Sequence, residues 1–150
     1  MPKPEGFTFY IIVVCEGKTT VLKMLMGDIS ITSGDAYIGS YSIQKDMKRA
    51  HSQIGYCPQF DACLPQLTGR ETLRLFCQIK GLKEECIPQV IKQISESLLF
   101  TKSLDKQFKT YSGGNKRKLS TAVSMIGNPS IIFLDEPTAG SLRFPCYQTI

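Results

Sequence analysis

The chain has 150 residues, enough for one domain with a hydrophobic core, and its formal net charge is +5. This modest basic excess is typical of a solvated surface with local anion sites and does not indicate a nucleic-acid platform. The six cysteines form no Cys-x-x-Cys pair and stand beside no histidine array, so the sequence predicts reduced thiols and no zinc site.

The first predicted element is a buried strand in the β-branched and aromatic stretch 7–14. The apolar run at 9–15 is much shorter than the roughly 20 residues that a membrane helix needs. It also lacks the small-residue cleavage site of a signal peptide. We therefore expect no direct membrane insertion by this segment.

A Gly-Lys-Thr sequence follows this strand and opens a predicted helix that ends at Gly27. The expected apolar face of this helix consists of Val21, Leu22 and Leu25. Strand, Gly-Lys-Thr and helix form the second half of the phosphate-binding motif G-x-x-x-x-G-K-[ST]. In that motif backbone amides cradle the phosphates, the lysine reaches the β/γ oxygens and the hydroxyl binds Mg²⁺.

The first half of this motif departs from the pattern. Ile12 stands where the first glycine is expected, and a β-branched residue fits poorly in a loop that needs left-handed backbone. Glu16 brings a negative charge towards a triphosphate. Because glycines let the backbone close in on a phosphate, we expect an incomplete cradle around Lys18.

The stretch 28–43 contains short β signals around a turn at 32–34 and shows no evident chemistry. The sequence then predicts a strand at 54–57, after which Gln59 follows Pro58 in a loop. Taken alone, Gln59 is an ordinary turn residue. His51, in a polar stretch before this strand, is predicted to be a surface residue without a catalytic role.

Two amphipathic helices are predicted next. The capping box Thr68-x-x-Glu71 begins the first helix, which carries Leu73, Phe76 and Cys77 and ends near Gly81. The second has apolar residues at helical spacing, with a proline tolerated in its first turn. These apolar positions are Ile87, Val90, Ile91, Ile94 and Leu98. We assign both faces to packing, since nothing in them requires a cofactor.

A Ser112-Gly113-Gly114 turn opens the next predicted helix. Two glycines permit positive backbone dihedrals and close approach of a ligand, and helix amides that point into the turn suit a phosphate. The alternative is a simple helix cap with Ser112 as N-cap. Against this alternative, residues 116–118 are three cations near a helix start, where the dipole opposes them. A local rule broken in this way often marks a functional site.

The continuous apolar run 131–134 predicts a parallel strand that is covered on both faces. Ligands of open α/β sheets bind at the carboxyl ends of the strands, where Asp135 and Glu136 follow. One carboxylate can hold hydrated Mg²⁺ while the other polarises a water that attacks a phosphoryl group. The alternative is a solvated strand end without chemistry.

Together these stretches resemble a known family. The sequence YSGGNKRKLS resembles the signature motif of ATP-binding cassette (ABC) transporters, usually LSGGQ, and IIFLDEPTAG resembles their Walker B segment. Asn115 and the KRKLS continuation are most similar to the second nucleotide-binding domain of subfamily A, the lipid exporters. The resemblance runs from about 17 to 140, with the motifs in the family's order.

This resemblance implies a fold and a domain organisation. The fold is that of an α/β P-loop NTPase of the ABC ATPase type, with a mainly parallel sheet core and a small antiparallel β region. A helical subdomain is expected at about 67–110. Residues 1–150 would form a partial, truncated nucleotide-binding domain, with divergent flanks at 1–16 and 141–150.

The resemblance also implies ATP and Mg²⁺ as ligands, and a role for each matching residue. The expected ATP-binding residues are Gly17, Lys18, Thr19, Thr20, Ser112, Gly113, Gly114 and Asn115. Catalysis would belong to Glu136 and Gln59, because the place of Gln59 is the family's Q-loop, whose amide reaches Mg²⁺ and the attacking water. Thr19, Gln59 and Asp135 would hold the metal.

Some features of the family are missing from the sequence. The family normally has a glycine where Cys15 stands and a small residue in place of Glu16. The stretch 141–143 replaces the family's Met-Asp-Pro pattern, and no histidine follows the Walker B segment. We therefore expect that this chain alone completes neither of the two ATP sites to which it contributes.

The function implied is an ATPase domain fragment that couples ATP turnover to transmembrane lipid transport. Its expected partners are the transmembrane domains and a second nucleotide-binding domain, with the chain at the cytosolic face of a membrane. One alternative is a non-catalytic module that completes a partner's ATP site. Another is a DNA-maintenance ATPase, which the absence of sustained heptads between residues 20 and 110 disfavours. We expect no nucleic-acid partner.

Overall fold

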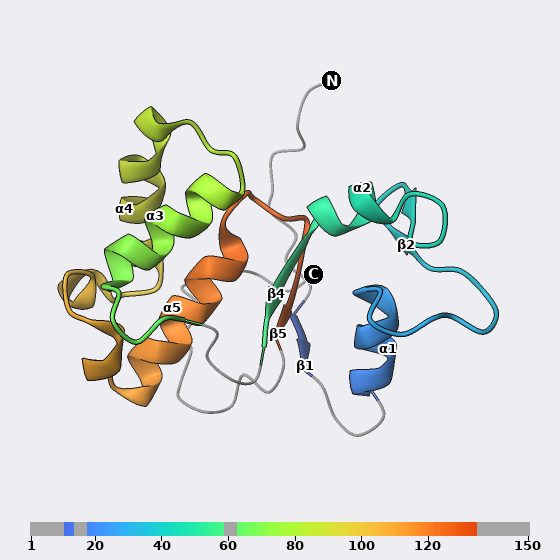
Figure 1. Ribbon diagram of the computed structural model, residues 1–150, viewed down its shortest axis with the longest axis horizontal. Helices are drawn as coiled ribbons and strands as arrows, with labels where there is room; N and C mark the ends of the chain where they lie inside the picture. Colours follow the sequence, from blue (N-terminus) through green and yellow to red (C-terminus); the bar gives the residue numbers. More distant parts are fainter. Residues whose placement is uncertain (1–10, 14–17, 59–62, 135–150) are drawn as a thin grey trace.

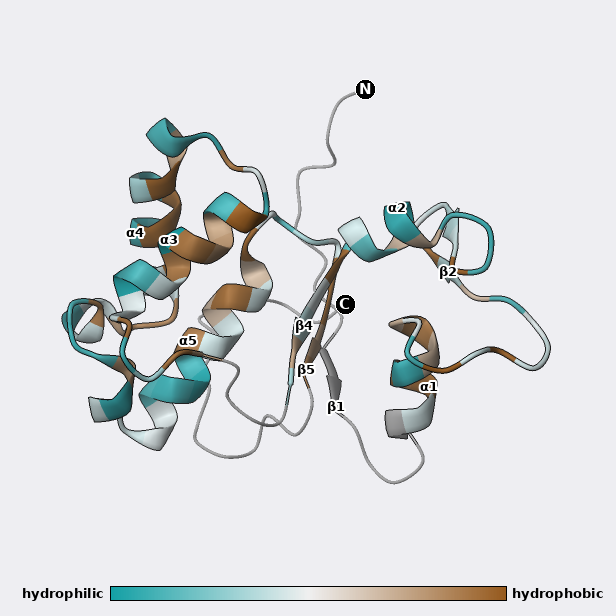
Figure 2. Ribbon diagram, viewed as in Figure 1, coloured by the Kyte–Doolittle hydropathy of each residue, from teal (hydrophilic) through white to brown (hydrophobic). Residues whose placement is uncertain are grey.

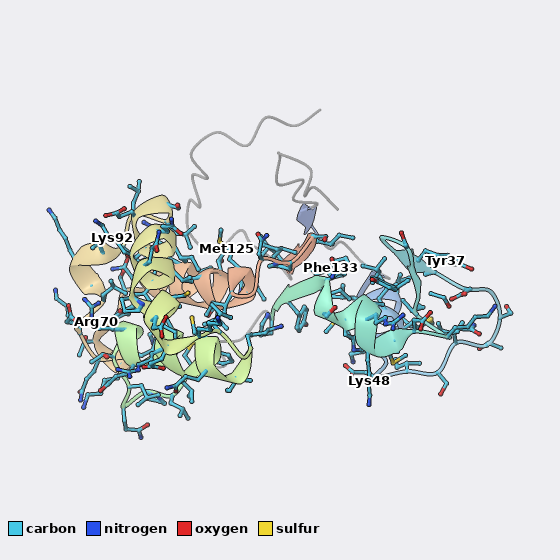
Figure 3. All side chains as sticks on the ribbon, turned by 90° about the horizontal axis from the view of Figure 1, so that it is seen from above. Tyr37, Lys48, Arg70, Lys92, Met125 and Phe133 are labelled. Atoms are coloured by element: carbon cyan, nitrogen blue, oxygen red, sulfur yellow. The ribbon has the colours of Figure 1, made fainter. Side chains whose placement is uncertain are left out.

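A parallel sheet lies in the middle of the molecule, with helices on both sides of it (Figure 1). The computed structural model describes residues 11–13, 18–58 and 63–134, and side chains from residue 20 onward. Seen from above, Arg70 and Lys92 mark the helical end of the molecule, and Tyr37 and Lys48 mark the opposite end (Figure 3). Phe133 lies between them, in the sheet.

The sheet consists of β1 (Ile11–Val13), β5 (Ile131–Leu134) and β4 (Ile54–Cys57), in the order β1-β5-β4, and both pairings are parallel. The predicted bounds of the strands at 54–57 and 131–134 are confirmed. In β5 the last three residues are buried, as a strand covered on both faces requires. Only 11–13 of the predicted first strand lies among the described residues, and these three residues are extended.

Helix α5 (Gly113–Met125) covers one face of the sheet. Cys57, Ile132 and Leu134 pack on that face, with Met125 against them. A Cβ atom on Gly55 would lie 2.1 Å from the backbone oxygen of Ser124, so only glycine allows the helix to approach β4 this closely.

The other face is covered by α1 (Lys18–Leu25) and α2 (Met47–Ser52). A small antiparallel hairpin, β2 (Tyr37–Ile38) and β3 (Tyr41–Ser42), lies beside them and confirms the predicted antiparallel region. The buried core on this side consists of Leu22, Ile38, Ile43, Ala50, Ile54 and Phe133.

The end of α1 occurs where the sequence predicted it. Gly27 has a φ of +80°, and its N–H bonds to the carbonyl oxygen of Met24 at 3.1 Å, while the N–H of Asp28 bonds to that of Lys23 at 2.8 Å. This pair of bonds is a Schellman motif. One expectation was wrong: Val21 is 56% exposed, whereas Leu22 is buried and Leu25 packs partly buried against the same core.

His51 was predicted to be a surface residue, and the structure adds a packing contact to its partly exposed ring. Its ring is half-buried, and Nε2 lies 3.1 Å from the carbonyl oxygen of Leu25, the last residue of α1. Because that carbonyl has no partner within its own helix, α2 supplies one through His51.

The helical part of the molecule contains α3 (Gly69–Ile79) and α4 (Ile87–Ser97). The 3-10 turn η1 (Glu84–Cys86) lies between α3 and α4, and η2 (Thr101–Ser103) and η3 (Phe108–Thr110) lie between α4 and α5. The apolar sides of α3, α4 and α5 face one another (Figure 2), and both predicted stripes are confirmed as packing surfaces. None of the described helices is long and apolar enough to cross a membrane.

Candidate functional site

The three parallel strands end at the same level of the sheet. Val13 in β1 and Cys57 in β4 are both Cα partners of Leu134 in β5. Beyond these three residues the chain continues to the Gly-Lys-Thr sequence, to Pro58 and Gln59, and to Asp135. The register therefore starts all three predicted segments from one edge, the carboxyl edge where α/β sheets bind ligands.

Several predicted site residues lie outside the described part of the chain: Gly17, Gln59, Asp135 and Glu136. Cys15, Glu16 and the stretch 141–143 also lie outside it. Lys18 and Thr19 begin α1, and the structure describes their backbone only. Thr20 is exposed in the first turn of that helix. The Lys-Thr-Thr sequence thus forms a helix N-terminus, the position at which backbone amides are available to an anion.

Ile12 lies in the sheet and not in a loop. It belongs to β1 and is the Cα partner of Phe133, and the strand continues to Val13. In the full phosphate-binding motif this position is the first glycine of the loop. The structure therefore extends the strand into the place where the loop would begin.

The Ser112 turn caps helix α5 and also leaves the backbone of its first residues accessible. The Oγ of Ser112 accepts a hydrogen bond from the N–H of Asn115 at 3.4 Å, which makes it the N-cap of α5. A Cβ atom on Gly113 or on Gly114 would meet no atom within 4 Å, among the described residues. The first amides of a 13-residue helix are thus left uncovered, which fits the approach of a phosphate.

Gly113 and Gly114 do not adopt the positive backbone dihedrals that glycine permits. We expected them to provide positive backbone dihedrals, but neither belongs to the glycines with positive φ, and both are the first residues of α5. Their contribution is the missing side chain, which leaves the backbone of this turn accessible.

Asn115 does not point its amide nitrogen into the open space. Its Nδ2 donates to the Oγ of Ser103 in η2 at 3.0 Å. The side chain predicted to bind the ligand therefore braces the turn against the preceding segment.

The three cations after the turn all have partners within the chain. The Nζ of Lys116 lies 5.4 Å from the centre of the Phe108 ring, and that of Lys118 donates to the carbonyl oxygen of Leu99 at 3.2 Å. The Nη1 of Arg117, a residue only 5% exposed, donates to the carbonyl oxygen of Pro58 at 2.5 Å. The sequence indicates these charges as a mark of function, but their contacts within the chain account for them structurally.

Tyr111 is a residue of this region that sequence reasoning missed. It is 7% exposed, and its hydroxyl donates to the carbonyl oxygen of Ser103 at 2.5 Å. Burial raises the pKa of the Tyr111 phenol above its ordinary value. A Cβ atom on Gly69 would lie 2.2 Å from this hydroxyl oxygen, so the glycine that begins α3 makes room for it. The only signal in the sequence was a glycine directly after the N-cap Thr68.

The segment before the turn is bound to the start of α3. The N–H of Arg70 bonds to the carbonyl oxygen of Leu104 at 2.9 Å, and its guanidinium pairs with Asp105 at 2.7 Å. This pairing holds the pKa of Asp105 below its ordinary value. Both side chains are more than half exposed, so we expect the pair to contribute little to stability.

The described residues contain no group of three or more His, Cys, Asp or Glu side chains that could hold a metal ion. A shallow hollow of about 300 Å³ lies beside Met24, Ile29 and Met47, at the carboxyl end of α1. The Lys-Thr-Thr sequence lies at the other end of that helix. The hollow is therefore separate from the sheet edge at which the motifs meet.

Comparison with known proteins gives one family and several relatives. The profile of the ABC transporter family matches residues 15–139. Over 124 residues, 83% of this chain, the chain is 50% identical to the phospholipid-transporting ATPase ABCA3 of Rattus norvegicus and 49% identical to ATP-binding cassette sub-family A member 2 of that organism. Over the same length it is 50% identical to the human retinal-specific phospholipid-transporting ATPase ABCA4. The chain spans 7%, 5% and 6% of these three proteins.

A solved structure supports the fold independently. The structure of an ATP binding subunit of an ABC transporter superimposes with a TM-score of 0.72 at 22% identity, over 89% of this chain and 56% of that one. The predicted fold, an α/β P-loop fold with a mainly parallel sheet, is thereby confirmed.

Proposed function

The chain belongs to the ABC transporter family, and from this premise we propose that it binds and hydrolyses ATP as part of a phospholipid exporter. Similarity to proteins named phospholipid-transporting ATPases supports the lipid as the transported substrate. The observation that carries the proposal is the common level at which β1, β5 and β4 end. Three motifs that act on one nucleotide have to start from one edge, and these do.

At this edge we propose a division of roles. Lys18 binds the phosphate oxygens, and Glu136 polarises the attacking water with Gln59 beside it. Thr19, Gln59 and Asp135 supply oxygen ligands, which is the donor type that Mg²⁺ prefers. When bound, Mg²⁺ neutralises charge on the phosphates.

The Ser112 turn serves a different nucleotide, held by a second nucleotide-binding domain. The openness around Gly113 and Gly114 supports this role, since a partner's phosphate needs access to the helix amides. We propose Ser112, Gly113 and Gly114 as the direct contacts, and Asn115 as the residue that holds the turn through Ser103. The chain then contributes halves of two ATP sites.

The remaining partners follow from the same premise. We propose that transmembrane domains of the parent protein bind this chain at the cytosolic face of a membrane. The helical subdomain would comprise about 67–110, a stretch in which the structure contains α3, α4 and the three 3-10 turns. The described helices between residues 20 and 110 have at most 11 residues, which disfavours a DNA-maintenance ATPase with long coiled coils.

One observation favours a second candidate function. Because Ile12 pairs with Phe133 inside the sheet, the phosphate loop begins without the glycine that would let its backbone close around a phosphate. A chain with this loop could act as a non-catalytic module whose Ser112 turn completes the ATP site of a partner.

An equilibrium titration of the chain with ATP and Mg²⁺ separates the two candidates. If the proposed site works, the chain binds ATP, and Lys18→Ala weakens binding about tenfold or more, because a charge-assisted contact to phosphate is lost. Lys116→Ala is the matched control, since this cation lies over the Phe108 ring and not at the sheet edge. No binding by the unaltered chain would favour the non-catalytic module.

Turnover is tested in the full-length transporter that carries this sequence. We expect Mg²⁺-dependent ATP hydrolysis to be lost in Glu136→Gln while ATP binding persists, because the amide cannot accept the proton of the attacking water. Hydrolysis at an unchanged rate in this variant would exclude the role assigned to Glu136.

A further inference from the structure

We propose that Arg117 is a positioning residue that fixes the carboxyl end of β4 against α5. Its Nη1 donates a hydrogen bond to the carbonyl oxygen of Pro58, the first residue after β4, at a distance of 2.5 Å. The two residues are 59 positions apart in the sequence, and the side chain of Arg117 is 5% exposed. A hydrogen bond from a charged group, protected from water in this way, is stronger than a bond between neutral groups.

Helix α5 contacts the β4 segment at two places, and the bond from Arg117 is the second of them. At the first place Gly55 lets the strand pass directly under Ser124. Arg117 lies two helical turns before Ser124, and Pro58 lies three residues after Gly55, so the guanidinium bond lies nearer the start of α5. The helix is thereby held to the strand near its end by close packing and nearer its start by one directed bond.

The same part of the chain also holds Pro65 and Leu67, which lie beyond 59–62. The N–H of Lys109 bonds to the carbonyl oxygen of Pro65 at 3.1 Å, and that of Phe108 bonds to the carbonyl oxygen of Leu67 at 2.9 Å. Residues on both sides of 59–62 are therefore tied to the stretch 108–117, which contains the Ser112 turn. Displacement of the start of α5 would move Pro58 with it.

This inference deepens the proposed function and rests on it for its consequence. If the Ser112 turn binds a partner's nucleotide, Arg117 transmits the position of that turn to the end of β4, next to Gln59. The physical contact exists without any nucleotide, so it can be tested separately.

Two buried cysteines provide the test. Cys57 precedes Pro58 and is 0% exposed, and Cys77 is 0% exposed in the core of the helical part. Their alkylation by iodoacetamide in native buffer, measured peptide by peptide with mass spectrometry, reports opening at the strand end and in the helical core respectively. The quantity compared is the ratio of the Cys57 rate to the Cys77 rate, which cancels general loosening.

In Arg117→Met we expect this ratio to rise about tenfold, the effect of losing one charge-assisted bond. Arg117→Lys keeps the charge and a donor, and should give a ratio between those of the unaltered chain and the methionine variant. Lys116→Met is the matched control, because the neighbouring cation does not contact Pro58, and its ratio should not change.

An unchanged ratio in Arg117→Met overturns the proposal, and so does an equal rise of both rates, which would show general loss of packing. A lysine variant as reactive as the methionine variant also overturns it, because the charged donor would then be irrelevant. Should the methionine variant not fold, Arg117→Lys against the unaltered chain decides, with a smaller rise expected and no rise contradicting. Failure of ATP binding would leave all these ratios unaffected, since no nucleotide is present.

Discussion

Helices α3 and α5 begin with the same local pattern and use it differently. Thr68 caps α3, and Ser112 caps α5, each accepting a bond from the N–H three residues later. At α3 the glycine after the cap lies against Tyr111, whereas at α5 a Cβ atom on Gly113 would meet none of the described residues within 4 Å. One helix start is closed by packing and the other is left accessible.

The third residue after each cap shows the same difference. Glu71 bonds back to the N–H of Thr68 at 2.7 Å, which completes the capping box. Asn115, at the matching position of α5, turns its amide to Ser103 instead. A helix start that is capped but not covered suits a phosphate-binding turn, so this contrast supports the role that we propose for the Ser112 turn better than the glycines alone do.

The largest effect that we predict is a difference in stability between two variants, each of which adds one methyl group to a helix start. Gly69→Ala should lower the free energy of unfolding by about 1–3 kcal/mol, because the methyl group would overlap the buried hydroxyl of Tyr111. Gly113→Ala should change the free energy of unfolding by no more than about 0.5 kcal/mol, since no atom of the described residues lies within 4 Å of the added methyl group. Urea unfolding of both variants measures the difference.

Tyr111→Phe provides the control for this pair. It removes the oxygen that the methyl group would meet, so the cost of Gly69→Ala should be smaller in the phenylalanine background than in the unaltered chain. An equal cost in both backgrounds, or equal costs for the two glycine substitutions, would contradict the contrast between a closed and an open helix start.

Sequence reasoning succeeded where the determining pattern was local. The apolar runs at 54–57 and 131–134 gave the strand bounds, and the box Thr68-x-x-Glu71 gave the start of α3. These features depend on neighbours a few residues away, which the sequence shows directly.

Sequence reasoning failed where a residue's contact partner is distant in the chain. The cations after Ser112 were judged against their own helix dipole, but Arg117 is paired with Pro58, 59 residues away. His51 bonds to Leu25, and Tyr111 fills the space left by Gly69, contacts that no local period encodes. For the site, the order of the motifs was predictable, but the level at which the three strands end was not, because register is a property of the folded sheet.

A smaller effect is expected from removing the two caps. Thr68→Ala should cost about 1 kcal/mol of stability, because it breaks a reciprocal box. Ser112→Ala should cost about 0.5 kcal/mol, because its hydroxyl accepts one long bond of 3.4 Å. Urea midpoints at neutral pH compare the two, and a larger cost at Ser112 would show that its cap is the more important structurally.

The smallest predicted effect is a pH dependence of stability, which we expect at the start of α3 and not at the start of α5. The N–H and the hydroxyl of Thr68 hold the pKa of Glu71 below its ordinary value of 4.5. A group whose pKa is lowered on folding stabilises the fold above its unfolded pKa, and this stabilisation is lost as the pH falls through the folded value. The urea midpoint of Glu71→Gln should therefore lie below that of the unaltered chain at pH 7, and the gap should close as the pH falls below 4.5.

Asn115→Gln at the matching position of α5 is the control for this pH dependence. Neither amide titrates, so its difference from the unaltered chain should stay constant over the same pH range. If the gap for Glu71→Gln also stays constant, the carboxylate does not close the start of α3. The contrast between the two helices would then rest on the packing of Gly69 against Tyr111 alone.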